Sequence, residues 1–100
     1  MKMVMSPKVR AKLANKSPPV SRVEVEQCFA SRDRGFLEDD REQNRTVPPT
    51  WWFISDTFMG RLLKVVFILL EDGTIVIKSA YEPNEEEIRI YYKFSEELKP

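Results

Sequence analysis

The alternation of apolar and polar residues predicts two short helices in the first third of the chain. The segment SPKVRAKLANK begins with Ser6 as a capping residue, has a proline at the first helical position and contains an apolar i,i+4 pair. This pattern predicts a helix over residues 7–15. Further on, Ser21 and Glu24 have the spacing of a capping box, which predicts a helix over residues 22–31. Two prolines between the segments prevent one continuous helix.

The pattern then changes to that of strands. We expect a short edge strand over residues 35–38, followed by a charged loop. Three segments rich in aromatic and β-branched residues come next, TWWFIS, RLLKVVFILL and TIVIKSA. The tight-turn signal Asp72-Gly73 joins the last two, so the three segments predict an antiparallel meander. The middle segment is apolar at both alternating sets of positions, so both faces of the sheet need at least partial cover.

The chain ends on a third helical pattern. Asn84 is a good capping residue, three glutamates follow it in the first turn, and Tyr91 and Tyr92 belong to an apolar face. This pattern predicts a helix over residues 85–97. The fold class is therefore α+β, with two N-terminal helices, a three- to four-stranded antiparallel sheet and a C-terminal helix. A length of 100 residues with 42% hydrophobic content fits a single domain over residues 1–100.

Two adjacent tryptophans must point to opposite faces of their strand. We expect Trp52 to pack inward with Ile54 against a sheet covered by helices on one face, and Trp51 to be the more exposed indole. An exposed indole can stack on unpaired bases. Packing at the edge of the strand is the simpler interpretation of Trp51.

Composition excludes several kinds of site. The chain has no histidine, and its single Cys28 can form neither an internal disulfide nor a thiolate zinc site. The three glycines are scattered singly and form no phosphate-binding loop, so we expect no cofactor. The acidic stretch EDDRE at residues 38–42 could coordinate a hard cation, but a solvated loop is the simpler interpretation, so we expect no metal. The N-terminus lacks the apolar core of a secretory signal, and the longest apolar run is too short to span a bilayer. These features predict a cytoplasmic protein without a membrane segment.

The remaining candidates for chemistry are cations and tyrosines. RNA can be cut without histidine when one group deprotonates the ribose 2′-hydroxyl, cations stabilise the phosphate and another group protonates the leaving oxygen. The 16 basic and 16 acidic residues cancel, so the net charge permits only a local phosphate site. Ordinary surface charges and half-buried tyrosines are the alternative interpretation. The candidates are Arg41, Arg45, Arg61, Lys78, Tyr81, Tyr91 and Tyr92.

Several segments resemble the BrnT-type toxins of bacterial toxin–antitoxin pairs. They are KVRAKL, VSRVEVEQCF, DREQNR, GRLLKVVFI and IVIKSAYEPNEEEIRIYY, and together they extend over nearly the whole chain. That family resembles the RelE superfamily in fold. The resemblance implies a metal-independent ribonuclease that arrests translation and is neutralised by a cognate antitoxin protein. RNA is then the substrate, and a second copy of the chain is a further candidate partner.

The resemblance and the chemistry together select the site residues. Arg61 and Tyr91 match the family pattern, and Arg41 or Arg45 is the candidate for the arginine of its loop. If the loop recognises phosphate, at least one of these arginines should point towards Arg61 or Lys78. If both instead pair with acids of the same loop, namely Glu38, Asp39, Asp40 or Glu42, the loop is a solvated charge cluster. We assign catalysis to Arg61, Tyr81, Lys78 and Tyr91, and RNA binding to Arg41, Arg45 and Trp51.

The register of the last hairpin limits which of these residues can meet. Pairing through its turn places Lys78 near Phe67, so we expect Arg61 to converge with Tyr81 rather than with Lys78. The chain also departs from the family pattern. Tyr81 stands where an arginine is expected, a histidine after the first helix is replaced, and the last helix opens with glutamates.

These departures weaken the attraction for phosphate and keep a second hypothesis open. In that hypothesis the chain is a non-catalytic protein-interaction module on the same fold. Similar short chains also carry the name ADP-ribosyl-(dinitrogen reductase) hydrolase. That name is typical of a far larger, metal-dependent, all-helical enzyme. This sequence has neither the size of such an enzyme nor a clear acidic metal motif.

Overall fold

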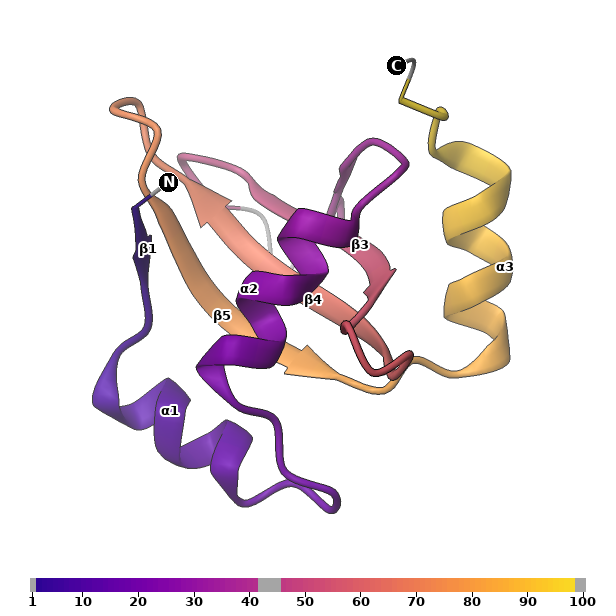
Figure 1. Cartoon of the computed structure of the whole chain (residues 1–100). Helices are drawn as coiled ribbons and strands as arrows, with labels where there is room; N and C mark the ends of the chain where they lie inside the picture. The colour runs from indigo at the N-terminus through magenta and orange to yellow at the C-terminus, as the bar shows by residue number, and fades with distance from the viewer. Residues whose placement is uncertain (1, 42–45, 99–100) are drawn as a thin grey trace.

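The computed structural model of the chain describes residues 2–41 and 46–98, which form an α+β fold of helices packed on a mixed sheet (Figure 1). The elements in chain order are β1 (Met3–Val4), α1 (Pro7–Ala14), α2 (Arg22–Ser31), β2 (Leu37–Glu38), β3 (Thr50–Asp56), β4 (Leu62–Leu69), β5 (Ile75–Tyr81) and α3 (Glu85–Phe94).

Within the described residues the sheet has five strands in the order β1-β5-β4-β3-β2. The predicted meander is present as β3, β4 and β5, with β2 antiparallel to β3 at one edge. The prediction missed β1, which lies parallel to β5 at the other edge, with Met3 opposite Ile75. The sheet is therefore mixed and has one strand more than the upper predicted number. A strand of two residues is too short to show an alternating pattern, and only its pairing with β5 defines it.

The three helices begin at the predicted caps. Ser21 and Glu24 form both hydrogen bonds of a capping box, and Asn84 forms another with Glu87. The helix α3 ends at Phe94 rather than at residue 97, because the following segment pairs with the chain before β2. There the Gly35 amide donates to the carbonyl of Glu96 over 2.8 Å.

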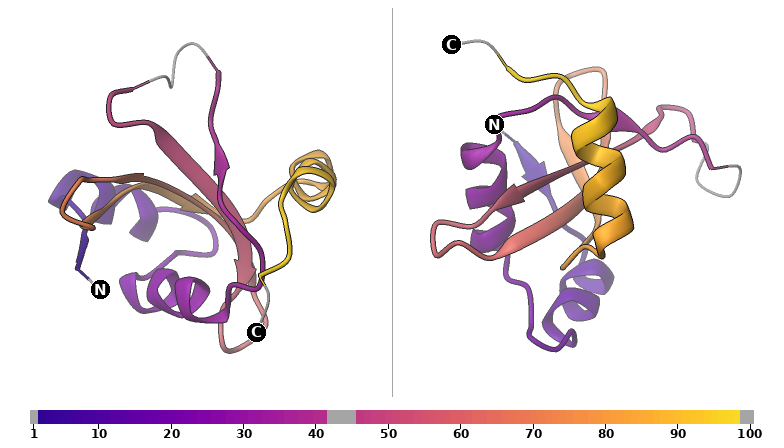
Figure 2. Two further views of the ribbon diagram at one scale, coloured as in Figure 1. Left: turned by 90° about the horizontal axis from the view of Figure 1, so that it is seen from above. Right: turned by 90° about the vertical axis from the view of Figure 1, so that its right-hand side faces the viewer.

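The helices lie on both faces of the sheet, which corrects the prediction that they cover one face. Figure 2 shows α1 and α2 on one side of the sheet and α3 on the other. On the α2 side, the ring of Phe29 lies 4.7 Å from that of Phe53. On the opposite side, the ring of Trp52 lies 5.6 Å from that of Tyr91 in α3. The reason is that the middle strand β4 is apolar on both faces, and each apolar face needs cover.

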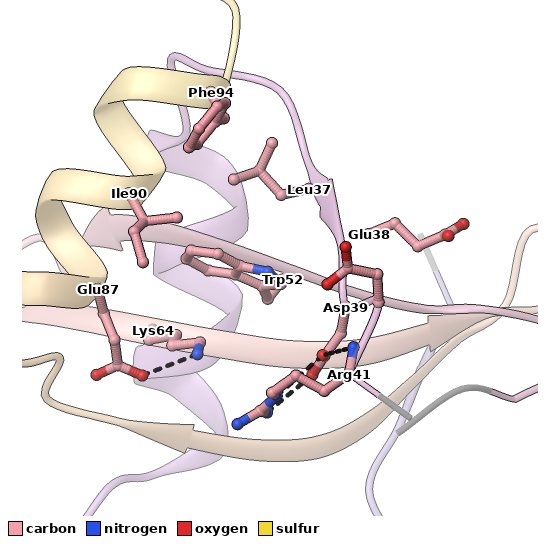
Figure 3. Close-up of a pocket in the computed structure, with 10 residues that line it drawn as sticks. Leu37, Glu38, Asp39, Arg41, Trp52, Lys64, Glu87, Ile90 and Phe94 are labelled. Carbon is pink, nitrogen blue, oxygen red and sulfur yellow. Dashed lines mark hydrogen bonds and ion pairs between the residues drawn. The ribbon is translucent and has the colours of Figure 1, made fainter. Parts of the chain in front are cut away.

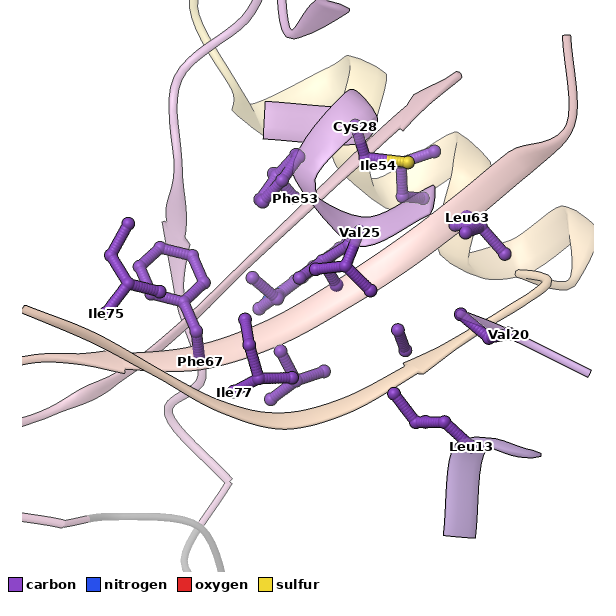
Figure 4. Close-up of a cluster of buried hydrophobic side chains, with 14 of the residues drawn as sticks. Leu13, Val20, Val25, Cys28, Phe53, Ile54, Leu63, Phe67, Ile75 and Ile77 are labelled. Carbon is purple, nitrogen blue, oxygen red and sulfur yellow. The ribbon is translucent and has the colours of Figure 1, made fainter. Parts of the chain in front are cut away.

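The hydrophobic core is centred on the α2 face of the sheet, and Figure 4 shows part of it. Its fully buried side chains include Phe53, Phe67 and Val25. On the α3 face, Trp52 is 9% exposed and Ile54 is 2% exposed, whereas Trp51 is partly exposed. The prediction that Trp51 is the more exposed indole is therefore confirmed, and base stacking on it stays a prediction.

Candidate functional site

A groove separates α3 from the neighbouring strands β2 and β3, with a cavity of about 520 Å³ (Figure 3). This volume lies within the range of ordinary ligand sites. Apolar side chains from both sides form one wall, and charged side chains form the other. We call it the Lys64 groove. Its lining residues are Leu37, Glu38, Asp39, Asp40, Arg41, Trp52, Lys64, Glu87, Ile90 and Phe94.

The most unusual residue of this groove is Lys64, a lysine in the middle strand of the sheet that is only 5% exposed. Its ammonium donates a hydrogen bond to Glu87 over 2.8 Å and lies 4.4 Å from the centre of the Trp52 ring. The Tyr81 hydroxyl donates to the same carboxylate oxygen over 2.8 Å. A buried charge is tolerated only when it is paired and hydrogen-bonded, and this cluster provides both.

Hydrogen bonding in this cluster changes the proton affinity of two members. Burial by itself raises the pKa of Glu87, but hydrogen bonds from Lys64, from the Asn84 amide and from Tyr81 outweigh burial and hold the pKa below its ordinary value. Burial, followed by the bond to Glu87, raises the pKa of Tyr81. At neutral pH the cluster therefore holds an ionised carboxylate and a neutral phenol.

Arg41 lies at the other end of the Lys64 groove. Its guanidinium donates to both carboxylate oxygens of Asp39, over 3.1 and 2.9 Å, and this bond raises the pKa of Arg41. The Asp39 side chain is 5% exposed, so the pair anchors the loop rather than lying loose in solvent. Arg41 thus pairs with Asp39, as the charge-cluster alternative requires, and the orientation required for phosphate recognition is not observed for it. The other loop arginine, Arg45, lies outside the described residues.

Arg61 is held by the protein itself. Its side chain donates five hydrogen bonds, to the carbonyls of Pro18 and Pro19, to Glu24 and twice to Glu82, over 2.6 to 3.1 Å. A guanidinium has five N–H donors, so none remains for a phosphate. Arg61 therefore fastens the segment between α1 and α2 to the start of β4. This geometry gives no support to the catalytic role that we predicted for it.

Arg61 and Tyr81 line a second hollow of about 330 Å³, together with Lys16 and Glu82. Lys78 does not line this hollow. It lies at an irregularity of the β4–β5 register, between the pairs formed by Phe67 with Ile77 and Val66 with Ser79. Arg61 therefore converges with Tyr81 rather than with Lys78, as the hairpin register predicts.

Tyr91 is part of the core. Its side chain is fully buried, and its hydroxyl donates to the carbonyl of Gly35 over 2.8 Å. Burial also raises the pKa of its phenol. A buried hydroxyl engaged in this way cannot reach a bound RNA, so the predicted catalytic role of Tyr91 is not supported. Its role in the structure is to join α3 to the chain before β2.

The two residues at the centre of the Lys64 groove, Lys64 and Glu87, are not among the site residues predicted from the sequence. A signal for Lys64 is present, because it is the single charge within the apolar run LLKVVFILL. A lysine inside a strand that is apolar on both faces requires an internal anionic partner. Nothing in the local pattern identifies Glu87 as that partner among the three glutamates of the first helical turn.

The described part of the chain shows no cluster of three or more carboxylate, thiol or imidazole groups that could hold a metal ion. Among the same residues, no helix combines the length and the apolar character that crossing a membrane requires. Comparison of the chain with protein-family models, with curated proteins and with solved structures finds no significant match.

Proposed function

We propose that this chain is a BrnT-like protein with a RelE-like fold that acts as a non-catalytic protein-interaction module. One observation carries the proposal: three cations of the candidate site are engaged by the protein itself. Arg61 uses all five donors, Lys64 is bound to Glu87, and Arg41 is bound to Asp39.

Ribonuclease chemistry needs cations that strengthen their contact with phosphate in the transition state. To bind phosphate, each of these cations must first break an ion pair, and three of their carboxylate partners, Asp39, Glu24 and Glu87, are themselves at least partly buried. Leaving such a carboxylate unpaired costs several kcal/mol, about as much as a phosphate contact returns. The fold therefore presents neutralised surfaces, which suits contact with another protein.

A ribonuclease toxin neutralised by a cognate antitoxin is the second candidate function. The cluster of Lys64, Tyr81 and Glu87 favours it, because a carboxylate, a cation and a phenol could serve as base, phosphate ligand and acid. Their shared hydrogen bonds of 2.8 Å place the three groups together beside the Lys64 groove. The lowered pKa of Glu87 and the raised pKa of Tyr81 make them a weak base and a weak acid, respectively.

Induced expression in bacteria, with growth and RNA integrity followed together, separates the two functions. For an interaction module we expect normal growth and intact RNA. Growth arrest with RNA fragments that disappear in Glu87→Gln and Tyr81→Phe variants would establish the ribonuclease instead. The resemblance to toxin–antitoxin pairs implies a partner encoded by an adjacent gene. Co-expression with the product of that gene, analysed by size-exclusion chromatography with light scattering, measures the complex. We expect a stable complex for the parent chain.

A further inference from the structure

A second groove lies on the other side of α3, where the chain after α2 separates from the end of β3. It has a volume of about 510 Å³. Two carboxylates, Asp33 and Asp56, belong to its lining, and no lysine or arginine does. We call it the Asp56 groove. It differs from the Lys64 groove, whose charged wall contains two cations.

The two carboxylates of the Asp56 groove are available to a ligand. Both residues are exposed, and neither makes a salt bridge or a side-chain hydrogen bond with any residue in the described parts of the chain. Ser55, which lines the same groove, is only 8% exposed. Its hydroxyl has no hydrogen-bond partner among the described residues. Because the hydroxyl oxygen is not sealed from solvent, it is free to form a hydrogen bond with a ligand in the groove.

Aromatic side chains complete the groove. Phe58, in the turn between β3 and β4, is 68% exposed, and Tyr92, on α3, is 50% exposed. The Arg34 guanidinium already lies 5.2 Å from the centre of the Tyr92 ring. The Phe58 ring has no such cation among the described residues, and an exposed ring beside unpaired carboxylates is the environment that a guanidinium prefers, because it stacks on the ring and donates hydrogen bonds to the carboxylates. The same carboxylates repel the phosphates of RNA.

We propose that the Asp56 groove binds an arginine side chain from a basic segment of a partner protein. The guanidinium stacks on Phe58 and donates to Asp33 and Asp56 and to the Ser55 hydroxyl, while apolar neighbours of the arginine pack at the edge of Tyr92. This inference rests on the proposed interaction function and gives the chemical class of the partner.

Titration of the full-length chain with a fluorescent peptide tests the inference. The peptide has about 12 residues in which arginine and leucine recur. A second peptide carries citrulline, which has nearly the same shape without the charge, at each arginine position. We expect the citrulline peptide to bind about 10-fold more weakly. Equal binding of the two peptides would overturn the inference, and so would the absence of binding.

Matched variants locate the binding surface. We expect Asp56→Asn and Asp33→Asn each to weaken the arginine peptide about 5-fold, and Phe58→Ala to weaken it by a similar factor. Two controls carry the same changes elsewhere: Glu71→Gln removes an exposed carboxylate in the β4–β5 turn, and Phe94→Ala removes an exposed ring from the Lys64 groove. Controls that weaken binding as much as the groove variants do would overturn the inference.

Other ligands provide further outcomes of the same titration. The competitors are calcium, spermidine, a single-stranded RNA and free arginine. If one of the first three displaces the peptide more strongly than free arginine does, the groove belongs to that ligand and the inference is overturned. A complex with the adjacent gene product that survives Asp33→Asn and Asp56→Asn unchanged would overturn the inference and leave the proposed function intact. RNA cleavage by the parent chain would overturn the proposed function, whatever the peptide does.

Discussion

The ammonium nitrogen of Lys64 lies 2.8 Å from a carboxylate oxygen of Glu87, and this ion pair joins the middle strand of the sheet to α3. Both side chains are largely buried, with 7% and 19% exposure, respectively. A pair of this kind adds little net stability compared with apolar residues, but removal of one partner leaves an uncompensated charge. The pair therefore specifies where α3 docks.

A double-mutant cycle measures this coupling. We expect Lys64→Met to lower the free energy of unfolding by about 2–4 kcal/mol, because it leaves the Glu87 carboxylate partly buried without its cation. Adding Glu87→Gln removes the unpaired charge while keeping an acceptor for Tyr81. The double variant should therefore be more stable than Lys64→Met alone. Urea unfolding of the four proteins gives the result, and strictly additive effects would show that the pair is not coupled.

Acid should remove the contribution of Glu87 to stability. Its folded-state pKa lies below the ordinary value of 4.5, so the stabilisation is complete above about pH 4.5 and is lost as the pH falls through the lower folded-state pKa. We expect the parent chain to exceed Glu87→Gln by about 1–2 kcal/mol at neutral pH and by much less near pH 3. Urea titrations at both pH values provide the measurement. An unchanged difference would contradict the assigned hydrogen bonds.

Replacement of Arg61 should lower the stability of the fold rather than weaken the binding of a ligand. Lysine cannot replace the five hydrogen bonds of this arginine, so we expect Arg61→Lys to lower the free energy of unfolding by about 2–3 kcal/mol. Lys78→Ala is the matched control, because the Lys78 side chain makes no hydrogen bond or ion pair with the described residues, and its effect should remain within about 0.5 kcal/mol. Thermal and urea unfolding compare the two. A stable Arg61→Lys variant that has lost RNA binding would restore the phosphate-binding hypothesis.

The thiol of Cys28 should be inert in the folded protein. Burial, reinforced by the charges of Asp56 and Glu24, raises its pKa to about 12, and the side chain is fully buried between α2, to which it belongs, and β3. We expect a thiol reagent at pH 8 to label Cys28 only as fast as the chain unfolds, and rapidly in denaturant. Mass spectrometry of the alkylated chain over time gives both rates. Fast labelling without denaturant would show that α2 opens locally.

The local elements could be predicted because their signals are local. A capping box requires two residues three positions apart, and Ser21 with Glu24 satisfies it within a single turn. The alternation of apolar residues likewise defines β3, β4 and β5, and the turn at Gly73 fixes the pairing of β4 with β5. For the same reason, the hairpin register correctly separated Lys78 from Arg61.

The candidate site could be predicted only in part. The chemistry of their side chains made Arg61 and Tyr91 candidates for binding or catalysis. Whether a side chain can contact a ligand, however, depends on what surrounds it in the fold. Arg61 meets carbonyls from residues 18 and 19, more than 40 positions away along the chain. Tyr91 meets Gly35 across 56 positions. Sequence spacing does not predict contacts between residues so far apart along the chain. In the sequence, a charged or polar residue that bonds other parts of the fold therefore looks the same as one that is exposed to a ligand.

The sequence by itself determined the α+β class, the helix caps, the meander and the absence of histidine chemistry, because each depends on composition or on neighbours within a few residues. Only the tertiary structure decided that α3 crosses to the face opposite α2, which leaves a groove on either side of it. It also decided which charges are neutralised and which two aspartates remain open. Those outcomes depend on the pairing of segments that are distant in the sequence. Burial makes an unpaired charge costly in free energy, and a charge that is paired inside the fold cannot bind a ligand.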